Sequence, residues 1–376
     1  MSLSPREKQV LALLRVEPGL DAAALAVRLG TTKGAVAVTL SALSRKGEIL
    51  GRTYQLRPEA FAVVVGGAAW DVKARSNNPT VLQTSNPAVV TRTPGGVGRN
   101  IAENIARLGD RVHLIAAVGN DSVGRDLIKL TAQSGVILDD IIMSAHPTGS
   151  YLAALDSSGE LVIGMGDFTA TDSLTVAELA GAKELISRAQ VVVVDANLPD
   201  EIISWVLLVS ATAAVPTVVE PVSVAKAERL AKMLNPERPV FVITPNLDEL
   251  GALVGHEVSD NEEEIITASL ELHERGVQHV WVSRGAEGSL LVSANADPLH
   301  IPALPTTVVD VTGAGDSMMA GFVHGILTGQ TPEVAAKYGH LSAALTVASP
   351  HTSRPDLGEA FIEALQKHDQ LIGETK

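Results

Sequence analysis

Short apolar runs rich in β-branched residues recur along the chain and alternate with longer segments of helical periodicity. The clearest runs cover residues 62–65, 191–195, 217–220 and 241–243. An apolar run of this length is typical of a strand that is buried on both faces, and strands that alternate with helices form parallel sheets. The pattern therefore predicts an α/β fold in which helices cover both faces of a mainly parallel sheet.

Polar residues follow two of these predicted strands. Asp195 and Glu220 end the second and third runs and Asn197 follows the second, at the edge where open parallel sheets bind ligands. Because such residues also begin helices, we interpret all three as helix caps, with a phosphate contact as the alternative for Asn197.

The first 57 residues have a pattern of their own. Leucine and valine recur at helical spacing in three segments, 5–16, 21–29 and 33–46, and two short strand-like pieces follow within 49–56. This part holds 9 of the 29 basic and 4 of the 43 acidic residues, so it carries +5 and the remainder −19, which together give −14. We therefore predict two domains, residues 1–57 and residues 58–376.

The N-terminal domain resembles a winged helix-turn-helix. That resemblance implies DNA contacts from Thr32 and Lys33, at the start of the third helix, and from Arg52 in the wing. The third helix is rich in Ala, Val and Ser, and few of its side chains can read base edges. A helical module for dimerisation, or for packing against the rest of the chain, explains the domain equally well.

Composition excludes several kinds of site. Of the 376 residues 46% are apolar, and there is no cysteine for a disulfide, a thiolate metal site or a thiol nucleophile. The ten histidines show no paired metal spacing, and the Gly-x-x-x-x-Gly-Lys-Ser/Thr loop of P-loop enzymes does not occur. The start lacks the apolar core of a signal peptide, and no later run is long enough to span a bilayer, so we expect a soluble cytoplasmic protein with no membrane partner.

A glycine-rich turn joins a β-branched run to an apolar helix near the carboxyl end. We predict that residues 308–309 end a buried strand and that a helix begins near Ser317. Residues 313–315 then lie at a helix amino terminus, where unpaired N–H groups bind anions. Asp316 is placed to accept a proton from a hydroxyl while these amides stabilise a phosphoryl group. An ordinary strand-to-helix turn with Asp316 as its cap is the alternative.

A second glycine loop opens a helix within residues 94–109. Asn100 lies one turn into this helix, where its amide would hydrogen-bond vicinal hydroxyls brought up against the glycines. Upstream, residues 62–71 predict a first core strand that ends at Asp71, an acceptor for the hydrogen bonds of a diol. These are two polar clusters from opposite ends of the larger domain.

From about residue 61 onward the chain resembles the PfkB (ribokinase-like) family of carbohydrate and nucleoside kinases, because both glycine signatures occur in the expected order. The resemblance implies a ribokinase-like three-layer α/β/α sandwich with a small β lid, and ATP with Mg²⁺ as the phosphate donor. The amino-acid sequence of residues 95–104 is most similar to that of pseudouridine kinases. This implies phosphorylation of the 5′-hydroxyl of a ribonucleoside, pseudouridine above all, with another ribose-bearing substrate or a sugar as the alternative.

The resemblance also assigns roles to individual residues. The residues that would hold the ribose are Asp71, Gly95, Gly96 and Asn100. The residues that would carry out the transfer are Asp316 as the base and Gly313, Ala314 and Gly315, whose amides form the anion hole.

Further residues would serve the nucleotide. Asn246 and Glu249, three positions apart at a helix start, would organise magnesium and phosphates through water, and a capping box is the alternative. Arg284 would meet a phosphate and Gly285 would let the nucleotide lie close, while a hairpin turn with a solvated arginine is the alternative.

The resemblance also implies a monovalent cation site, with K⁺ as the ion. The residues that would contribute to it are Asp310 and Thr312, with later oxygens from residues 348–351.

Residues 148–168 predict a hairpin, because two apolar runs flank the turn residues 156–159. In the family such strands, here around 80–93 and 148–168, form a lid that covers the sugar and often makes a dimer contact, so we expect a homodimer. The residues that would face a nucleobase come from Ser150, Tyr151, Met165 and Asp167. Packing within the lid is the alternative for Tyr151 and Met165.

Two classes of function therefore compete. In the first, the chain is an ATP-dependent kinase for a small-molecule nucleoside or sugar. In the second, the kinase fold is a ligand sensor, and the N-terminal domain binds DNA. The presence of Asp316, Asn246 and Glu249 favours the kinase, because a sensor needs neither a proton acceptor nor residues that organise magnesium and phosphates.

Overall fold

The computed structural model describes residues 3–51 and 60–367. The chain forms two compact units, Met1–Ala60 and Phe61–Lys376. Each unit has its own hydrophobic core, so each is described by itself.

The N-terminal unit contains the helices α1 (Pro5–Val16), α2 (Ala22–Arg28) and α3 (Lys33–Arg45). These bounds lie within a residue of the predicted ones, because each helix begins at a capping side chain, Ser4, Asp21 or Thr32. Val10, Leu14, Leu25, Val36 and Leu43 form its core. The predicted contact residue Arg52, and most of the predicted wing, lie outside the described residues.

Within residues 3–51 and 60–367, no single helix combines the length and hydropathy of a bilayer span, and α2 and α3 meet these two criteria only together, across a bend of 111°.

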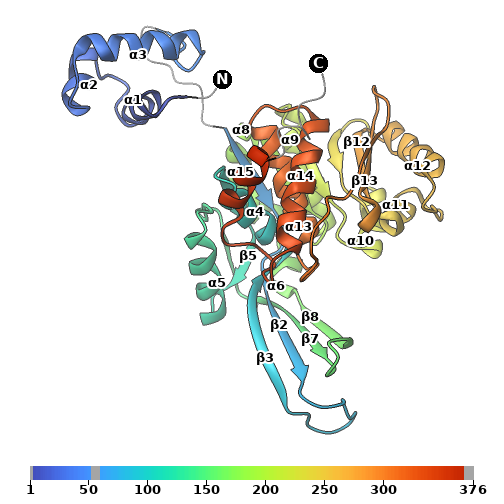
Figure 1. The fold of residues 1–376 in the computed structure, drawn as a ribbon. Helices are drawn as coiled ribbons and strands as arrows, with labels where there is room; N and C mark the ends of the chain where they lie inside the picture. Colours follow the sequence, from blue (N-terminus) through green and yellow to red (C-terminus); the bar gives the residue numbers. More distant parts are fainter. Residues whose placement is uncertain (1–2, 52–59, 368–376) are drawn as a thin grey trace. The chain divides into compact units, whose positions relative to one another are not determined.

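The larger unit is built on an eight-stranded sheet (Figure 1). In spatial order its strands are β14 (Leu299–Ile301), β13 (Ser289–Ser293), β12 (Val277–Ser283), β11 (Val240–Ile243), β10 (Thr217–Glu220), β9 (Val191–Asp195), β1 (Phe61–Val65) and β4 (Arg111–Ile115). The strands from β4 to β12 are parallel, and β13 and β14 are antiparallel additions at one edge.

Helices cover both faces of this sheet, as the apolar runs predict. Alternate residues of each strand enter different cores: Val192 and Val194 pack in one, and Val191 and Val193 in the other. The helices on the first face are α8 (Lys183–Arg188), α9 (Asp200–Thr212), α10 (Val224–Ala231), α11 (Leu247–Val254) and α12 (Glu262–Glu274). Those on the second are α4 (Val97–Arg107), α5 (Ser122–Gln133), α13 (Ala314–Leu327), α14 (Pro332–Val347) and α15 (Leu357–Lys367). The fold is therefore the predicted three-layer α/β/α sandwich.

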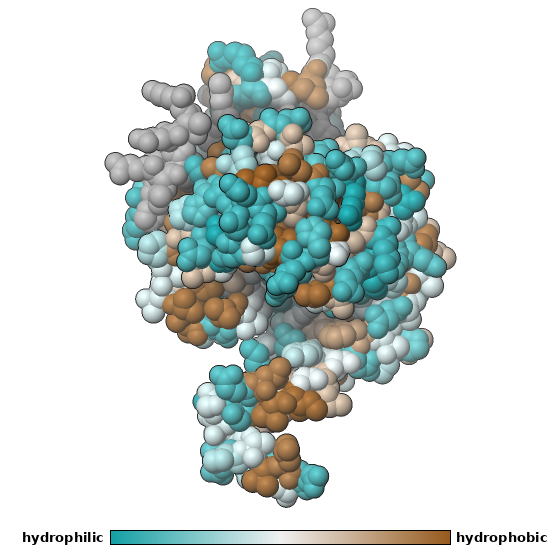
Figure 2. All heavy atoms as spheres, turned by 90° about the vertical axis from the view of Figure 1, so that its right-hand side faces the viewer, coloured by the Kyte–Doolittle hydropathy of each residue, from teal (hydrophilic) through white to brown (hydrophobic). Residues whose placement is uncertain are grey.

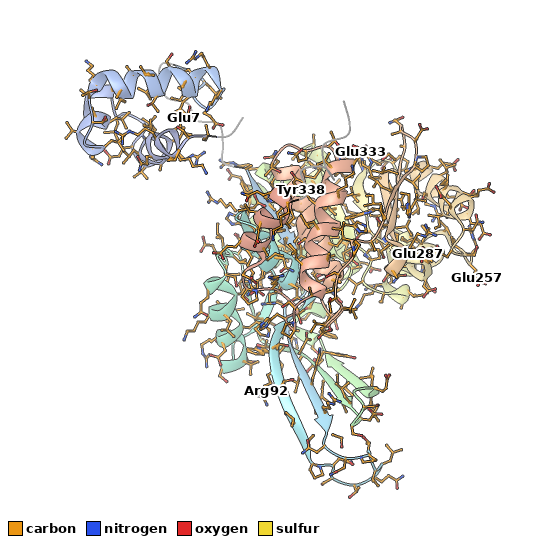
Figure 3. The ribbon with its side chains drawn as sticks, viewed as in Figure 1. Glu7, Arg92, Glu257, Glu287, Glu333 and Tyr338 are labelled. Atoms are coloured by element: carbon orange, nitrogen blue, oxygen red, sulfur yellow. The ribbon has the colours of Figure 1, made fainter. Side chains whose placement is uncertain are left out.

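Aromatic rings join the last three helices on the second face. Tyr338 of α14, labelled in Figure 3, stacks on His324 of α13 and meets Phe361 of α15 edge to face. The helices α13 and α14 pack closely because Gly321 and Gly325 have no side chain to hold them apart. This packing fixes the axis of α13, whose first turn carries Asp316.

A second, four-stranded sheet projects from the sandwich as a lid (Figure 1). Its spatial order is β3 (Ala88–Gly95), β2 (Ala69–Ser76), β7 (Gly149–Leu155) and β8 (Leu161–Asp167). The structure also contains a small sheet of β5 (Ala117–Gly119) and β6 (Ile142–Ser144), and the short helices α6 (Thr169–Asp172) and α7 (Val176–Leu179).

The lid differs from the prediction in two places. Asp71 does not end the first core strand, because β1 stops at Val65 and Asp71 lies within the lid strand β2. The break falls at Gly66 and Gly67, where the chain turns from one sheet into the other. The lid strand predicted from residue 80 begins only at Ala88.

The prediction of a buried strand ending at Val308 and Val309 is wrong. Both lie in a loop, with 63% and 56% of their surface exposed. The amides of Val309 and Asp310 bond to the carbonyl of Val347 rather than to a strand. β-Branched residues favour extended backbone whether or not a neighbouring strand is present, so the pattern alone could not distinguish the two cases.

Candidate active site

The amino termini of α4 and α13 meet in the second helical layer. Both helices begin at a glycine with positive φ, Gly96 at 92° and Gly313 at 80°. A Cβ at Gly96 would collide with the backbone of Gly67, and one at Gly313 with the carbonyl of Thr352. Glycine is therefore required at both helix starts, for conformation and for space.

Asn100 and Asp316 make the contact between these two helix starts. The Asn100 Nδ2 donates a hydrogen bond of 2.7 Å to Asp316 Oδ2. Asn100 is 5% exposed, and Asp316 is partly buried. The two glycine motifs, at opposite ends of the domain sequence, thus form one site.

A buried arginine fixes the orientation of the Asn100 amide. Arg99 is 2% exposed, and its guanidinium donates to Asn100 Oδ1 at 2.6 Å. Because guanidinium is only a donor, the amide oxygen must face Arg99 and the amide nitrogen must face Asp316. Glu103, one turn further along α4, pairs with Arg99 at 2.6 Å and with Arg107 at 2.5 Å.

Burial raises the pKa of Asp316 to about 7. The nearby charges of Asp195 and Asp71 add to this rise, whereas the Asn100 hydrogen bond and Arg99 oppose it. A carboxyl with a pKa near the working pH is well suited to general base catalysis, because it is ionised often enough and still basic enough to take a proton. Asp316 therefore has the properties of a proton acceptor.

Asp71 lies against Gly95, the first glycine of the loop. A Cβ at Gly95 would collide with the Asp71 carboxylate, and burial raises the pKa of this carboxyl. Asp71 comes from β2 and Gly95 from the neighbouring β3. The lid sheet thus brings these two predicted ribose contacts together beside Asn100.

Asp71 and Asn100 border a cavity of about 220 Å³, the size of a small ligand, whereas Gly95 and Asp316 are not among its lining residues. Its lining includes Asp71, Gly96, Asn100 and Tyr151 from the predicted set. Asp167 does not line this cavity, and its carboxylate accepts hydrogen bonds from the amide and hydroxyl of Thr169.

The first turn of α13 leaves backbone amides without intrahelical acceptors. The first intrahelical bond runs from the Ser317 amide to the Gly313 carbonyl, so the amides of Gly315 and Asp316 have no intrahelical acceptor. The Ala314 amide donates to the Val311 carbonyl in a turn. This arrangement can stabilise an anion, with Gly315 open to solvent beside it.

Asn246 and Glu249 form the capping box of α11. The Asn246 side chain accepts from the Glu249 amide at 2.9 Å, and Glu249 accepts from the Asn246 amide at 3.0 Å. Burial raises the pKa of Glu249, and it raises that of neighbouring Glu220 to about 8, with the charges of Glu249 and Asp316 adding to the latter rise. The capping role is compatible with a role toward a nucleotide, because each side chain has a second polar atom that the capping hydrogen bonds do not use.

The described residues do not form a cage for a divalent ion. No group of three or more acidic or histidine side chains with suitable placement occurs among them. Magnesium usually keeps several waters and binds through substrate phosphates. A magnesium ion carried by a nucleotide needs no such cage.

Arg284 and Gly285 lie in the hairpin between β12 and β13. The Arg284 guanidinium pairs with Asp260 at 2.5 Å, and Gly285 has a φ of 56°.

The segment of the predicted cation site is held by local contacts. The Asp310 carboxylate accepts a hydrogen bond from the Thr312 amide at 2.8 Å and lies 3.9 Å from the Lys73 ammonium.

The interpretation of Asp195, Asn197 and Glu220 as helix caps is wrong. Asp195 is fully buried and accepts from the amides of Gly67 and Asn197, and Asn197 accepts from Lys226. Glu220 accepts from the Thr244 hydroxyl. The helices that follow begin at other residues, because loops of several residues intervene.

Three features of the site were not predicted from the sequence. Arg99 is one of them: Glu103 follows it by one helical turn, a spacing that indicates an ion pair along a helix but not that the pair is buried. Asp172 and Lys226 line the cavity from a short helix and from the first turn of α10. Neither belongs to a recognisable motif, so only the fold brings them together.

The chain is similar to known kinases. Residues 59–357 match the pfkB family of carbohydrate kinases. A pseudouridine kinase of Escherichia coli K12 is 32% identical over 318 residues, which cover 84% of this chain and all of that protein. The uncharacterized sugar kinase YeiI of the same organism is 31% identical over 356 residues, covering 94% and 97%.

Solved structures show the same fold. A carbohydrate kinase from Agrobacterium tumefaciens superimposes with a TM-score of 0.69 at 30% identity, covering 81% of this chain and 97% of that one. Arabidopsis thaliana ribokinase, complexed with ribose and ATP, gives a TM-score of 0.70 at 25% identity, covering 82% and 99%. The chain therefore belongs to the pfkB family of carbohydrate kinases and is a kinase of that family.

Proposed function

We propose that the protein transfers the γ-phosphoryl group of ATP to the 5′-hydroxyl of a ribonucleoside, with pseudouridine as the preferred acceptor. The observation that carries the proposal is the Asp316 carboxylate in the first turn of α13, which accepts a hydrogen bond from Asn100, a residue that lines a cavity of about 220 Å³. The choice of pseudouridine is supported by the E. coli relative and by an Arabidopsis thaliana pseudouridine kinase that is 26% identical over 355 residues.

In the proposed reaction, Asp71 and Asn100 hold the sugar hydroxyls and the primary hydroxyl points toward Asp316. Asp316 takes the hydroxyl proton as the oxygen forms a bond to the γ-phosphorus, and the bond from that phosphorus to the bridging oxygen of ADP breaks. The free amides at the start of α13 stabilise the charge on the phosphoryl oxygens. Magnesium on the nucleotide would neutralise part of the phosphate charge.

Further parts of the proposal concern the nucleotide and the cation. Gly285 has nothing within 4 Å of the position of a Cβ, so a nucleotide could lie close to this turn. Arg284 would exchange its Asp260 partner for a phosphate. The loop 309–313 contacts residues 347–352 through the Val347 and Thr352 carbonyls, which supports a potassium site built of backbone oxygens near Asp310 and Thr312.

We also propose that the lid sheet pairs with that of a second copy. Apolar side chains are exposed along it, among them Val89, Val90, Leu152, Ile163 and Met165, and Figure 2 shows hydrophobic surface on the projecting part of the molecule. An exposed apolar sheet of this kind is typical of an interface. Sedimentation should show a dimer at micromolar concentration, and a monomer there would contradict this part.

A second candidate function comes from the N-terminal unit. The 111° bend between α2 and α3 falls in the range of helix-turn-helix motifs. Thr32 caps α3 through its hydroxyl, and Lys33 is exposed at the start of that helix. A nucleoside-responsive DNA-binding regulator would use these residues toward phosphates, with the kinase fold as the sensor.

ATP consumption against a panel of acceptors separates the two candidates. With magnesium and potassium present, we expect pseudouridine to be turned over in preference to uridine, inosine, adenosine, ribose and fructose 6-phosphate. Turnover of a different acceptor would refute the choice of substrate. Binding of a nucleoside without turnover of any acceptor would contradict the kinase proposal and favour the sensor.

Replacing the proton acceptor tests the role of Asp316. Asp316→Asn should lower kcat by roughly 10²–10⁴-fold, because the general base is lost, and leave nucleoside affinity nearly unchanged. In the native enzyme kcat/KM should rise with pH through about 7 and level off above it, since only the ionised carboxyl accepts a proton. A near-native rate in the variant would show that Asp316 is not the base.

The same substitution should change stability in a defined pH window. Because the folded-state pKa of Asp316 lies above its ordinary value of 3.8, the folded protein binds more protons than the unfolded chain between about pH 4 and 7. The contribution of Asp316 to the free energy of unfolding is fully present at low pH and is lost as the pH rises through that window. Asp316→Asn should therefore melt a few degrees higher than the native protein at pH 8.

Removing the Asn100 amide should act on both binding and acidity. Asn100→Ala should raise the KM for the acceptor and shift the rise of kcat/KM to higher pH, because the hydrogen bond that lowers the Asp316 pKa is gone. Asn295→Ala, at an exposed loop position, is the matched control and should change neither. An unaltered pH profile in Asn100→Ala would contradict the proposed coupling.

A further inference from the structure

The cavity that Asn100 lines has a second group of polar residues that the transfer itself does not use. Besides Asp71 and Asn100, its lining includes Asp172, Asn197 and Lys226. Asp172 ends the short helix α6, and Lys226 lies in the first turn of α10. These side chains come from the body of the sandwich, whereas Asp71 comes from the lid.

Lys226 is held in place but keeps donors for a ligand. Its ammonium donates to Asn197 Oδ1 at 2.6 Å, which uses one of its three N–H groups. Within residues 3–51 and 60–367, no carboxylate lies within ion-pair distance of it, whereas Arg229 on the same helix pairs with Asp200 at 3.2 Å. Burial lowers the pKa of Lys226, and the charges of Asp195 and Asp172 oppose that change.

The lid supplies aromatic surface to the same cavity. Tyr151 and Phe168 both line it and are about one-third exposed, at 36% and 38%. A Cβ at Gly164 would collide with the Tyr151 ring, and one at Gly166 with the Phe168 ring. The two glycines of β8 thus let the rings lie against the strand, where they offer apolar faces to a flat ligand.

Accordingly, we propose that Lys226 and Asp172 read the base of the nucleoside, with Lys226 donating to a ring carbonyl and Asp172 accepting from a ring N–H. This inference rests on the proposed nucleoside kinase function and adds its specificity residues. When the sugar of a ligand lies at Asp71 and Asn100, the N–H groups of Lys226 and the carboxylate of Asp172 still need partners. A flat group that carries both carbonyl and N–H edges supplies them. A uracil ring has both kinds of edge.

The acceptor at Asp172 explains a preference for pseudouridine over uridine. The carbon-linked uracil of pseudouridine carries two ring N–H groups, whereas the nitrogen-linked uracil of uridine carries one and has a C–H at the corresponding position. A carboxylate that faces a C–H loses a charge-assisted hydrogen bond. Asn197 acts as a positioning residue, because its oxygen holds the Lys226 ammonium.

Initial rates of four proteins toward pseudouridine, uridine and ribose test this subsite. Lys226→Met should lower kcat/KM for pseudouridine roughly 10- to 100-fold, mainly through KM, and change that for ribose by less than about twofold. Asp172→Asn should reduce the preference for pseudouridine over uridine by roughly tenfold. Lys232→Met, at an exposed position at the end of α10, is the control and should behave as the native enzyme.

Lys226→Arg distinguishes a lost contact from a damaged fold. It should melt at the native temperature and recover part of the pseudouridine rate, because a guanidinium still donates to a carbonyl. Equal losses toward ribose and pseudouridine in Lys226→Met, or an unchanged preference in Asp172→Asn, would overturn the inference and leave the kinase function standing.

The native enzyme tests the proposed function separately. If it phosphorylates another nucleoside and not pseudouridine, the choice of substrate fails, and a selective loss of that nucleoside relative to ribose in Lys226→Met would still support base recognition. If it phosphorylates only a plain sugar, both proposals fall.

Discussion

The hydrogen bond from Asn100 to Asp316 joins residues 216 positions apart, and the geometry of the site depends on it. It forms because α4 and α13 both begin at glycines that allow their helix starts to approach other backbone. Arg99 holds the other end of the Asn100 amide, so the amide cannot rotate without leaving a buried donor unpaired. The Asp316 carboxylate is therefore oriented by groups that lie outside its own helix.

Burial and hydrogen bonding act in opposite directions on this carboxyl. Desolvation raises the pKa of Asp316 to about 7, and the Asn100 hydrogen bond limits the rise. Burial also raises the pKa values of Asp71, Glu220 and Glu249. A region with this many acidic groups disfavours a bare triphosphate, which is consistent with a nucleotide that brings its own cation.

The sequence predicts the sandwich well because its strands are apolar on both faces and its helices carry clear periodicity. The two glycine motifs also single out Asn100 and Asp316, which the structure brings into hydrogen-bond contact, because glycines mark where backbone must approach closely. Prediction from the sequence fails where the local residue pattern favours one structure and the contacts with the rest of the fold impose another. Val308 and Val309 are β-branched but lie exposed in a loop, and Asp195 follows a strand but bonds to the Gly67 amide rather than to a helix. Lys226 and Asp172 were missed because only the fold brings them to one cavity.

The most direct test of the account is an NMR titration of the Asp316 carboxyl carbon, identified by its loss in Asp316→Asn. The account predicts that Asp316 titrates near pH 7, because burial disfavours the charged form and the carboxylates of Asp195 and Asp71 lie nearby. Titration near the ordinary value of 3.8 would contradict it, since such a carboxylate would be a solvated helix cap and a poor proton acceptor at neutral pH.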